Sequence, residues 1–162
     1  MLDIGQDAPD FTLVDAKGES HRLADALAEG PVVLAFMKTS CGTCTLAFPY
    51  LERLHQAYPS DRWKIWGICQ DPASAAESFA GKTGVSFPML IDGDHFPVSQ
   101  AYDPPATPTI FFVDREGTIR SGHYGLAKPD LNALAEQVAA VLGEQPVVVA
   151  PPDDGIPDFK PG

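Results

Sequence analysis

The chain has 162 residues, which suits one domain, and 44% of them are apolar, which is enough for a buried core. Its formal net charge of -11 argues against nucleic acid and anionic membrane surfaces as partners, because both attract clusters of Lys and Arg. Three cysteines are too few for a disulfide-rich scaffold, and no apolar run is long enough to span a bilayer. We therefore expect one domain that binds no nucleic acid and is not inserted in a membrane.

Residues 1–30 predict a β-hairpin followed by a short helical turn. Two short extended stretches, 11–14 and 20–23, flank a Gly-containing turn at 15–18. A helical turn at 24–29 comes next, and Gly and Pro at 30–31 stop it. The hairpin is thus an N-terminal extension ahead of the main sheet.

A buried strand, a turn with two cysteines and a helix follow one another between residues 32 and 57. Residues 32–38 are almost continuously apolar, as expected for a central strand covered on both faces. The helix at 43–57 contains Pro49, which removes one backbone hydrogen bond and bends the axis. Cys41 and Cys44 lie in the turn between strand and helix.

The cysteine pair at the start of a helix predicts a redox dithiol. Unpaired backbone N–H groups and the positive end of the helix dipole favour a thiolate there, and a thiolate is the form that attacks disulfides. We predict that Cys41 is the nucleophile, and that Cys44, one turn further on the same face, closes a Cys41–Cys44 disulfide. A Cys-x-x-Cys pair can also be half of a zinc site, but no second pair or His-x-x-x-His completes it. We therefore predict no metal and no cofactor.

The second half of the chain continues the alternation of strands and helices. A strand at 63–68 ends at Cys69, and Asp71 is predicted to be the N-cap of a helix that has Pro72 in its first position and ends at Gly84. The remaining elements are an extended piece at 87–92, helical turns at 96–102, strands at 109–114 and 118–124, and a helix at 129–142. This order predicts an α/β fold with a central mixed β-sheet flanked by helices.

From residue 144 onward the composition changes. Proline and aspartate dominate residues 144–162, which suits neither a helix nor a central strand. We therefore divide the chain into a domain at 1–143 and a Pro-rich acidic C-terminal tail at 144–162. The tail is either laid along the domain through its valines at 147–149 or disordered.

Taken in this order, the motifs resemble thioredoxin-fold proteins of the TlpA/ResA type, within the wider AhpC/TSA superfamily. The resemblance spans residues 4–143 and is carried by the stretch 5–13, the dithiol with Pro49 behind it, and the segments 66–71, 107–109 and 113–117. It implies a thioredoxin-like fold and a thiol–disulfide oxidoreductase that reduces or exchanges disulfides in protein substrates. A redox partner, a role in cell redox homeostasis and antioxidant activity are further implications.

The resemblance also implies a substrate-binding set. Pro108 is expected to be a cis-proline facing the dithiol, so that the backbone of Thr107 can pair with a substrate strand, a form of β-augmentation. The alternative is a trans-proline that opens a strand. Gly42 would let a substrate backbone approach closely, and Thr43 lies beside it between the two cysteines.

Several positions depart from the family pattern or stay open. Relatives often carry a glutamate three residues after the second cysteine, where this chain has Ala47, so no carboxylate in the usual place helps Cys44 lose its proton. Lys38 is either an auxiliary group that stabilises a thiolate or a solvated lysine at a strand end. Cys69 is either an auxiliary third thiol near the dithiol or a small buried core residue.

Two other functions are kept as alternatives. A thioredoxin-fold metal carrier would bind Cu or Zn through Cys41 and Cys44, with Cys69 or a histidine in addition. A peroxiredoxin-like peroxidase needs a Pro-x-x-x-Thr/Ser-x-x-Cys pattern, and neither Cys41 nor Cys44 has those supporting residues. We expect a monomer in the cytoplasm, because residues 1–5 lack the features of a secretory signal; an exported soluble domain without its leader is the alternative.

Overall fold

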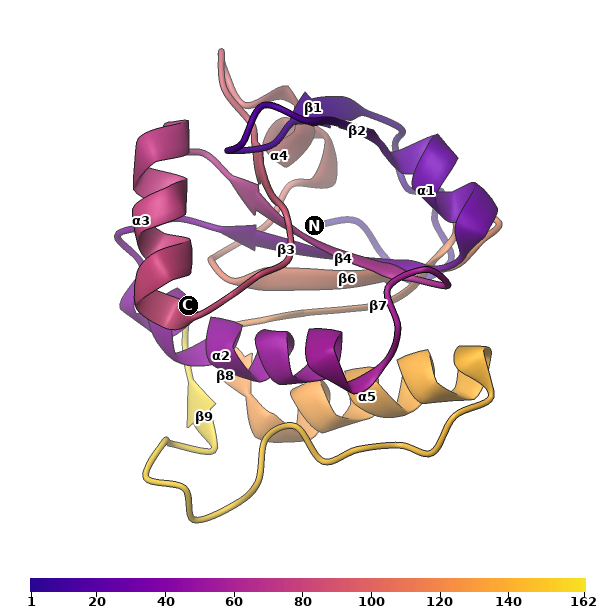
Figure 1. Cartoon of the computed structure of the whole chain (residues 1–162), viewed down its shortest axis with the longest axis vertical. Coiled ribbons are helices and arrows are strands. Elements are labelled where there is room, and N and C mark those ends of the chain that lie inside the picture. Colours follow the sequence, from indigo (N-terminus) through magenta and orange to yellow (C-terminus); the bar gives the residue numbers. More distant parts are fainter.

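A five-stranded mixed sheet in the order β5-β4-β3-β6-β7 is the centre of the computed structural model, which describes residues 1–162 (Figure 1). Its strands are β3 (Val32–Met37), β4 (Lys64–Cys69), β5 (Met89–Ile91), β6 (Thr109–Val113) and β7 (Ile119–Tyr124). The central strand β3 pairs in parallel with β4 and antiparallel with β6, and all of its residues are buried. The predicted α/β fold with a mixed sheet is confirmed.

Helices cover both faces of this sheet (Figure 1). The helices are α1 (Leu23–Glu29), α2 (Gly42–Ala57), α3 (Ala73–Thr83), α4 (Pro97–Tyr102) and α5 (Lys128–Leu142). Alternate residues of β3 belong to two separate apolar clusters, because successive side chains of a strand point to opposite faces of the sheet. One cluster takes Val33 and Met37 with α2, α3 and α5, and the other takes Leu34 and Phe36 with α1 and α4.

The predicted N-terminal hairpin is present as a small separate sheet. Its strands β1 (Thr12–Val14) and β2 (Ser20–Arg22) pair antiparallel. The carboxylate of Asp15 closes the turn by accepting hydrogen bonds from the backbone N–H groups of Lys17 and Glu19, at 2.8 and 3.0 Å.

The tail, residues 144–162, lies along the domain. Val149 and Ala150 are buried in the same apolar cluster as α2 and α5. A short strand, β9 (Phe159–Lys160), then pairs antiparallel with β8 (Leu126–Ala127), the segment that precedes α5. In Figure 1 the tail runs back beneath α5 and α2, and its end lies by the start of α2. That the tail and residues 1–143 are separate units stays a prediction.

The helices are all too short or too polar to cross a membrane.

Candidate active site

The two cysteines lie where the central strand passes into helix α2. β3 ends at Met37, and Cys41 is the N-cap residue of α2. Cys41 is partly exposed, whereas Cys44, one turn into the helix, is fully buried. The backbone N–H of Cys44 donates a hydrogen bond to the Cys41 sulfur at 3.0 Å. One of the unpaired N–H groups at the helix start is therefore directed at the exposed sulfur, an arrangement that suits negative charge on it.

A second segment, far away in the sequence, completes the site. β6 runs antiparallel to β3, with Thr109 opposite Phe36, and this pairing brings the loop before β6 beside the cysteines. The peptide bond between Thr107 and Pro108 is cis, as the resemblance implied. The Cys41 thiol donates a hydrogen bond to the carbonyl oxygen of Thr107 at 3.2 Å. The structure thus places Cys41 between the start of α2 and the backbone of Thr107.

Cys44 differs from Cys41 in its electrostatic surroundings. Burial is the main cause that raises the pKa of the Cys44 thiol well above its usual range, and the hydrogen bond with Cys41 raises it further. Ala47, which stands at the position of the glutamate expected from the resemblance, is fully buried, and so is Ala35 on β3. Cys44 is therefore the inner thiol of the pair and keeps its proton more firmly than an ordinary cysteine.

The two residues between the cysteines have different surroundings. Gly42 is exposed, and a Cβ built there would meet no atom within 4 Å, so there is open space above the dithiol turn. Thr43 is buried, and its hydroxyl donates a hydrogen bond to the carbonyl oxygen of Pro161 in the tail at 2.8 Å. This contact joins residues that are 118 positions apart, and no sequence motif indicated it.

Asp71 is not the N-cap of α3, so that prediction is wrong. Pro72 is the N-cap residue and provides no side-chain hydrogen bond. The Asp71 carboxylate accepts hydrogen bonds from the backbone N–H and the hydroxyl of Thr39, at 2.7 and 3.0 Å. Because Thr39 lies just before the dithiol turn, Asp71 ties the end of β4 to that turn. No sequence pattern indicates this contact, because Thr39 follows β3 and is 32 residues away from Asp71.

Cys69 and Lys38, the two predicted auxiliary groups, lie close in sequence to the hydrogen-bonded pair Asp71 and Thr39. Cys69 precedes Asp71 by two residues, and Lys38 directly precedes Thr39. Cys69 ends β4 opposite Met37 and is buried, which raises the pKa of its thiol to about 11. Its sulfur accepts a hydrogen bond from the backbone N–H of Asp71 at 3.4 Å. Lys38 is exposed, and its backbone carbonyl accepts a hydrogen bond from Cys41 N at 3.1 Å. Auxiliary roles for either side chain in the chemistry stay predictions.

Fold and site together define a protein class. A central mixed sheet, a dithiol at the start of the helix after β3 and a cis-proline facing it are the features of a thioredoxin-like redox protein. Comparison with known proteins agrees with this class. Residues 4–121 match the AhpC/TSA family, and the chain therefore belongs to that family.

Individual relatives narrow the assignment. The chain is 34% identical to the thiol-disulfide oxidoreductase ResA of Geobacillus kaustophilus over 137 residues, which is 83% of this chain and 78% of that protein. It superposes on a protein assigned as the thiol:disulfide interchange protein DsbE from Chlorobium tepidum with a TM-score of 0.77, at 28% identity, covering 88% of this chain and 100% of that one. The thioredoxin domain of a thiol-disulfide oxidoreductase from Bacteroides vulgatus gives a TM-score of 0.74 at 25% identity, covering 85% and 99%. The chain is thus a ResA-like thiol–disulfide oxidoreductase of the thioredoxin fold.

Proposed function

We propose that the protein reduces or exchanges disulfides in protein substrates, with Cys41 as the attacking thiolate and Cys44 as the resolving thiol. The observation that carries this assignment is the contrast between the two sulfurs. Cys41 is partly exposed and accepts a backbone N–H, whereas Cys44 is buried and its pKa is raised. An attacking group must be accessible and ionised, and a resolving group needs only to reach its neighbour.

The reaction proceeds in two exchanges. The Cys41 thiolate attacks one sulfur of the substrate disulfide, a new S–S bond forms, and the other substrate sulfur leaves as a thiolate. Cys44 then gives up its proton and attacks the Cys41 sulfur, which releases the second substrate thiol. The substrate gains two electrons, and the enzyme retains a Cys41–Cys44 disulfide that a redox partner must reduce.

The substrate strand is proposed to lie against Thr107, Gly42 and Thr43. The open space above Gly42 supports a close approach of a peptide backbone. The carbonyl of Thr107 already receives the Cys41 thiol, so a strand paired at that position would lie beside the reacting sulfur.

The raised pKa of Cys44 predicts a pH dependence of the second exchange. Only the thiolate attacks, and burial keeps the thiolate fraction of Cys44 small throughout the neutral range. The decay rate of the mixed disulfide should therefore rise about tenfold for each pH unit between roughly pH 6 and 9, without a plateau. Quenched-flow trapping of the mixed disulfide with mass analysis measures this rate. A plateau near the pKa of an ordinary thiol, about 8.5, would contradict the assignment of a deeply buried resolving thiol.

A direct comparison of substrates tests the proposed function against its alternatives. The reduced protein is mixed with a disulfide-containing peptide in one experiment and with hydrogen peroxide in another, and loss of free thiols is followed in both. We expect fast reaction with the peptide and slow reaction with peroxide. The reverse preference would favour a peroxidase. The metal-carrier alternative predicts tight, stoichiometric Cu or Zn that depends on both Cys41 and Cys44, and equilibrium dialysis with metal analysis measures it.

The redox partner, the monomeric state and the cytoplasmic location stay predictions from the sequence.

A further inference from the structure

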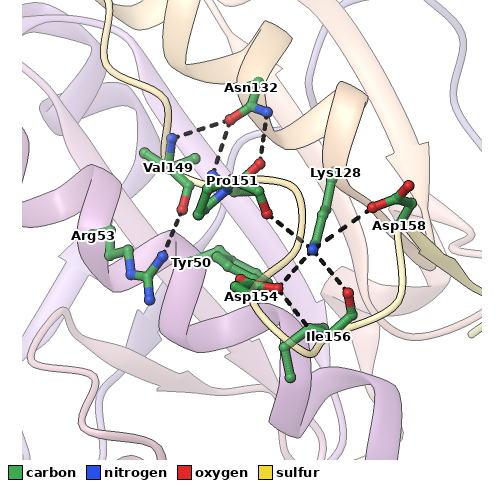
Figure 2. Close-up of polar contacts among 10 residues, drawn as sticks. Tyr50, Arg53, Lys128, Asn132, Val149, Pro151, Asp154, Ile156 and Asp158 are labelled. Atoms are coloured by element: carbon green, nitrogen blue, oxygen red, sulfur yellow. Dashed lines mark hydrogen bonds and ion pairs between the residues drawn. The ribbon is translucent and has the colours of Figure 1, made fainter.

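The first part of the tail is firmly anchored to α2 and α5. The side-chain oxygen of Asn132 accepts hydrogen bonds from the backbone N–H groups of Val149 and Ala150, at 3.1 and 3.0 Å, and its amide donates to the carbonyl of Ala150 at 2.9 Å (Figure 2). Arg53 on α2 donates to the carbonyl of Val149 at 3.1 Å. Both tail residues are buried. Val149 and Ala150 thus pack in the same apolar cluster as residues of α2 and α5.

The next turn of the tail surrounds a buried lysine. The ammonium of Lys128 donates hydrogen bonds to the carbonyls of Pro151 and Ile156 and to the carboxylate of Asp154, at 3.0, 2.8 and 2.7 Å (Figure 2). Its hydrogen-bond partners all come from the tail, although Lys128 itself is only 3% exposed. A buried ammonium without partners is strongly unfavourable, so this turn is held in place.

Asp154 is the nearer of the two carboxylates that pair with Lys128, at 2.7 Å against 3.7 Å for Asp158. The hydrogen bond from Lys128, and then that from Tyr50, hold the pKa of the Asp154 carboxyl well below its usual range. Asp154 therefore stays ionised throughout the neutral range, and its ion pair with Lys128 persists there.

Beyond the anchor, residues 159–162 reach the active site. β9 pairs with β8, and the carbonyl of Pro161 accepts the hydroxyl of Thr43 from between the two cysteines. Gly162 lies against the opposite side of the site: a Cβ built on it would be 2.5 Å from the carbonyl oxygen of Thr107. This is the same oxygen that receives the Cys41 thiol. The tail therefore touches the dithiol turn and the cis-proline loop at once.

The two parts of the tail differ in how firmly they are held. Residues 157–162 are all exposed, and Phe159 is 64% exposed, so this end buries little apolar surface. It is held by the short β8–β9 ladder, by a 2.9 Å hydrogen bond from Lys128 N to the Asp158 carbonyl and by the Thr43 contact. The Asp158 carboxylate also lies 3.7 Å from the Lys128 ammonium, but its side chain is 81% exposed, and exposed ion pairs contribute little. Segments with few buried contacts open locally while the rest of the fold stays intact.

We propose that residues 159–162 are an intramolecular competitor that occupies the substrate-binding edge of the dithiol site and must be displaced by an extended substrate. This inference rests on the proposed function, because it concerns the same site. The anchor at Lys128 keeps the competitor close to the site at all times, and the weakly held end lets a substrate strand replace it. Substrates that can themselves contact Thr43 and Thr107 displace residues 159–162 more easily than substrates that cannot, so the tail end favours extended peptides.

A competitor of this kind changes apparent affinity and leaves the rate at saturation unchanged. When only a fraction of the molecules has an open site, the concentration of substrate needed for half-saturation rises by the inverse of that fraction. Release of the tail end should therefore lower the half-saturating concentration of an extended peptide disulfide by about 3–10-fold, with the same maximal rate. A small disulfide such as oxidised 2-mercaptoethanol needs only the exposed sulfur of Cys41 and should react unchanged.

The test variant is Gly162→Val in the full chain. The added side chain clashes with the Thr107 carbonyl and with the Cβ of Ala106, which would lie 2.9 Å away, while residue 162 itself is exposed and has no part in the core. Val148→Thr is the control, because Val148 lies in the same tail, is 70% exposed and takes no part in the contacts that join the tail end to Thr43 and Thr107. Single-turnover reactions of the reduced wild type, Gly162→Val and Val148→Thr with the peptide disulfide and with oxidised 2-mercaptoethanol give six rate profiles to compare.

Hydrogen exchange provides a second measurement that does not depend on this variant. A Cys44→Ser protein that keeps the wild-type tail is trapped as a mixed disulfide with the peptide. The hydrogen-exchange rate of residues 157–162 in this complex is compared with the rate in the free Cys44→Ser protein. Faster exchange in the complex, together with a lower half-saturating concentration for Gly162→Val, is the expected result. Unchanged exchange in the complex, or identical peptide kinetics in Gly162→Val and wild type, overturns the competitor. If neither protein reacts with any disulfide, the proposed function fails first and the competitor fails with it.

Discussion

Replacing Cys41 by serine should reduce the rate of disulfide reduction by at least about 10³-fold, because a hydroxyl is a far weaker nucleophile than a thiolate and no second exposed thiol can take its place. Reduction of a peptide disulfide with dithiothreitol as electron source measures the effect. Cys69→Ser is the matched control. Cys69 is buried at the end of β4, so its replacement should leave the rate within about twofold, the range of a change away from the reacting atoms.

Cys44→Ser should give a different outcome from Cys41→Ser. The first exchange still occurs, but nothing attacks the Cys41 sulfur afterwards, so a mixed disulfide accumulates and can be isolated by mass. If Cys41→Ser retained activity while Cys44→Ser lost it without trapping a substrate, the two roles would be reversed. The burial of Cys44 makes that reversal physically unfavourable, because a substrate sulfur cannot reach it directly.

Gly30→Ala should lower the free energy of unfolding by about 3 kcal/mol, at the upper end of what overpacking a well-packed site costs. A Cβ at Gly30 would lie 1.8 Å from the carbonyl oxygen of Arg62 and 2.7 Å from its carbon. Both are backbone atoms, so no change of side-chain rotamer relieves the clash. Gly30 lies two residues before β3, the central strand that leads to the dithiol turn. A shift of the backbone at Gly30 therefore also disturbs the start of this strand.

Gly81→Ala is the matched substitution for this prediction. Gly81 lies in α3, is exposed, and has no atom within 4 Å of an added Cβ. Alanine should raise the free energy of unfolding by about 0.5–1 kcal/mol, because it loses less conformational entropy in a helix than glycine. Chemical denaturation of the two reduced variants and the wild type measures both changes. Equal midpoints for the two variants would show that the close approach at Gly30 is not a rigid part of the fold.

The sequence was most informative where the determinants are local. The hairpin, the buried strand at 32–37 and the cysteine pair at the helix start each depend on neighbouring residues, and the structure has all of them. The cis bond before Pro108 is not readable from local chemistry alone; it followed from the resemblance of the whole set of motifs. These elements are enough to identify the fold and the dithiol.

What the sequence did not indicate depends on contacts between distant segments. Asp71 has the residue type and position of a helix cap, yet its carboxylate bonds Thr39, which is 32 residues away. Lys128 is a helix-start lysine that any pattern would assign to the surface, and it is buried only because the tail folds back over it. The contact between Thr43 and Pro161 has the same origin. Such partners become visible only when the fold has placed the segments side by side.

The most direct test of the account is the redox equilibrium of the Cys41–Cys44 pair. The protein is equilibrated in graded dithiol and disulfide buffers, free thiols are alkylated, and the alkylated thiols are counted by mass. We predict a reversible two-electron transition in which Cys41 and Cys44 disappear together while Cys69 remains alkylatable after unfolding. A protein that forms no reversible disulfide between Cys41 and Cys44 at any buffer composition would contradict the assignment of this site as a redox dithiol.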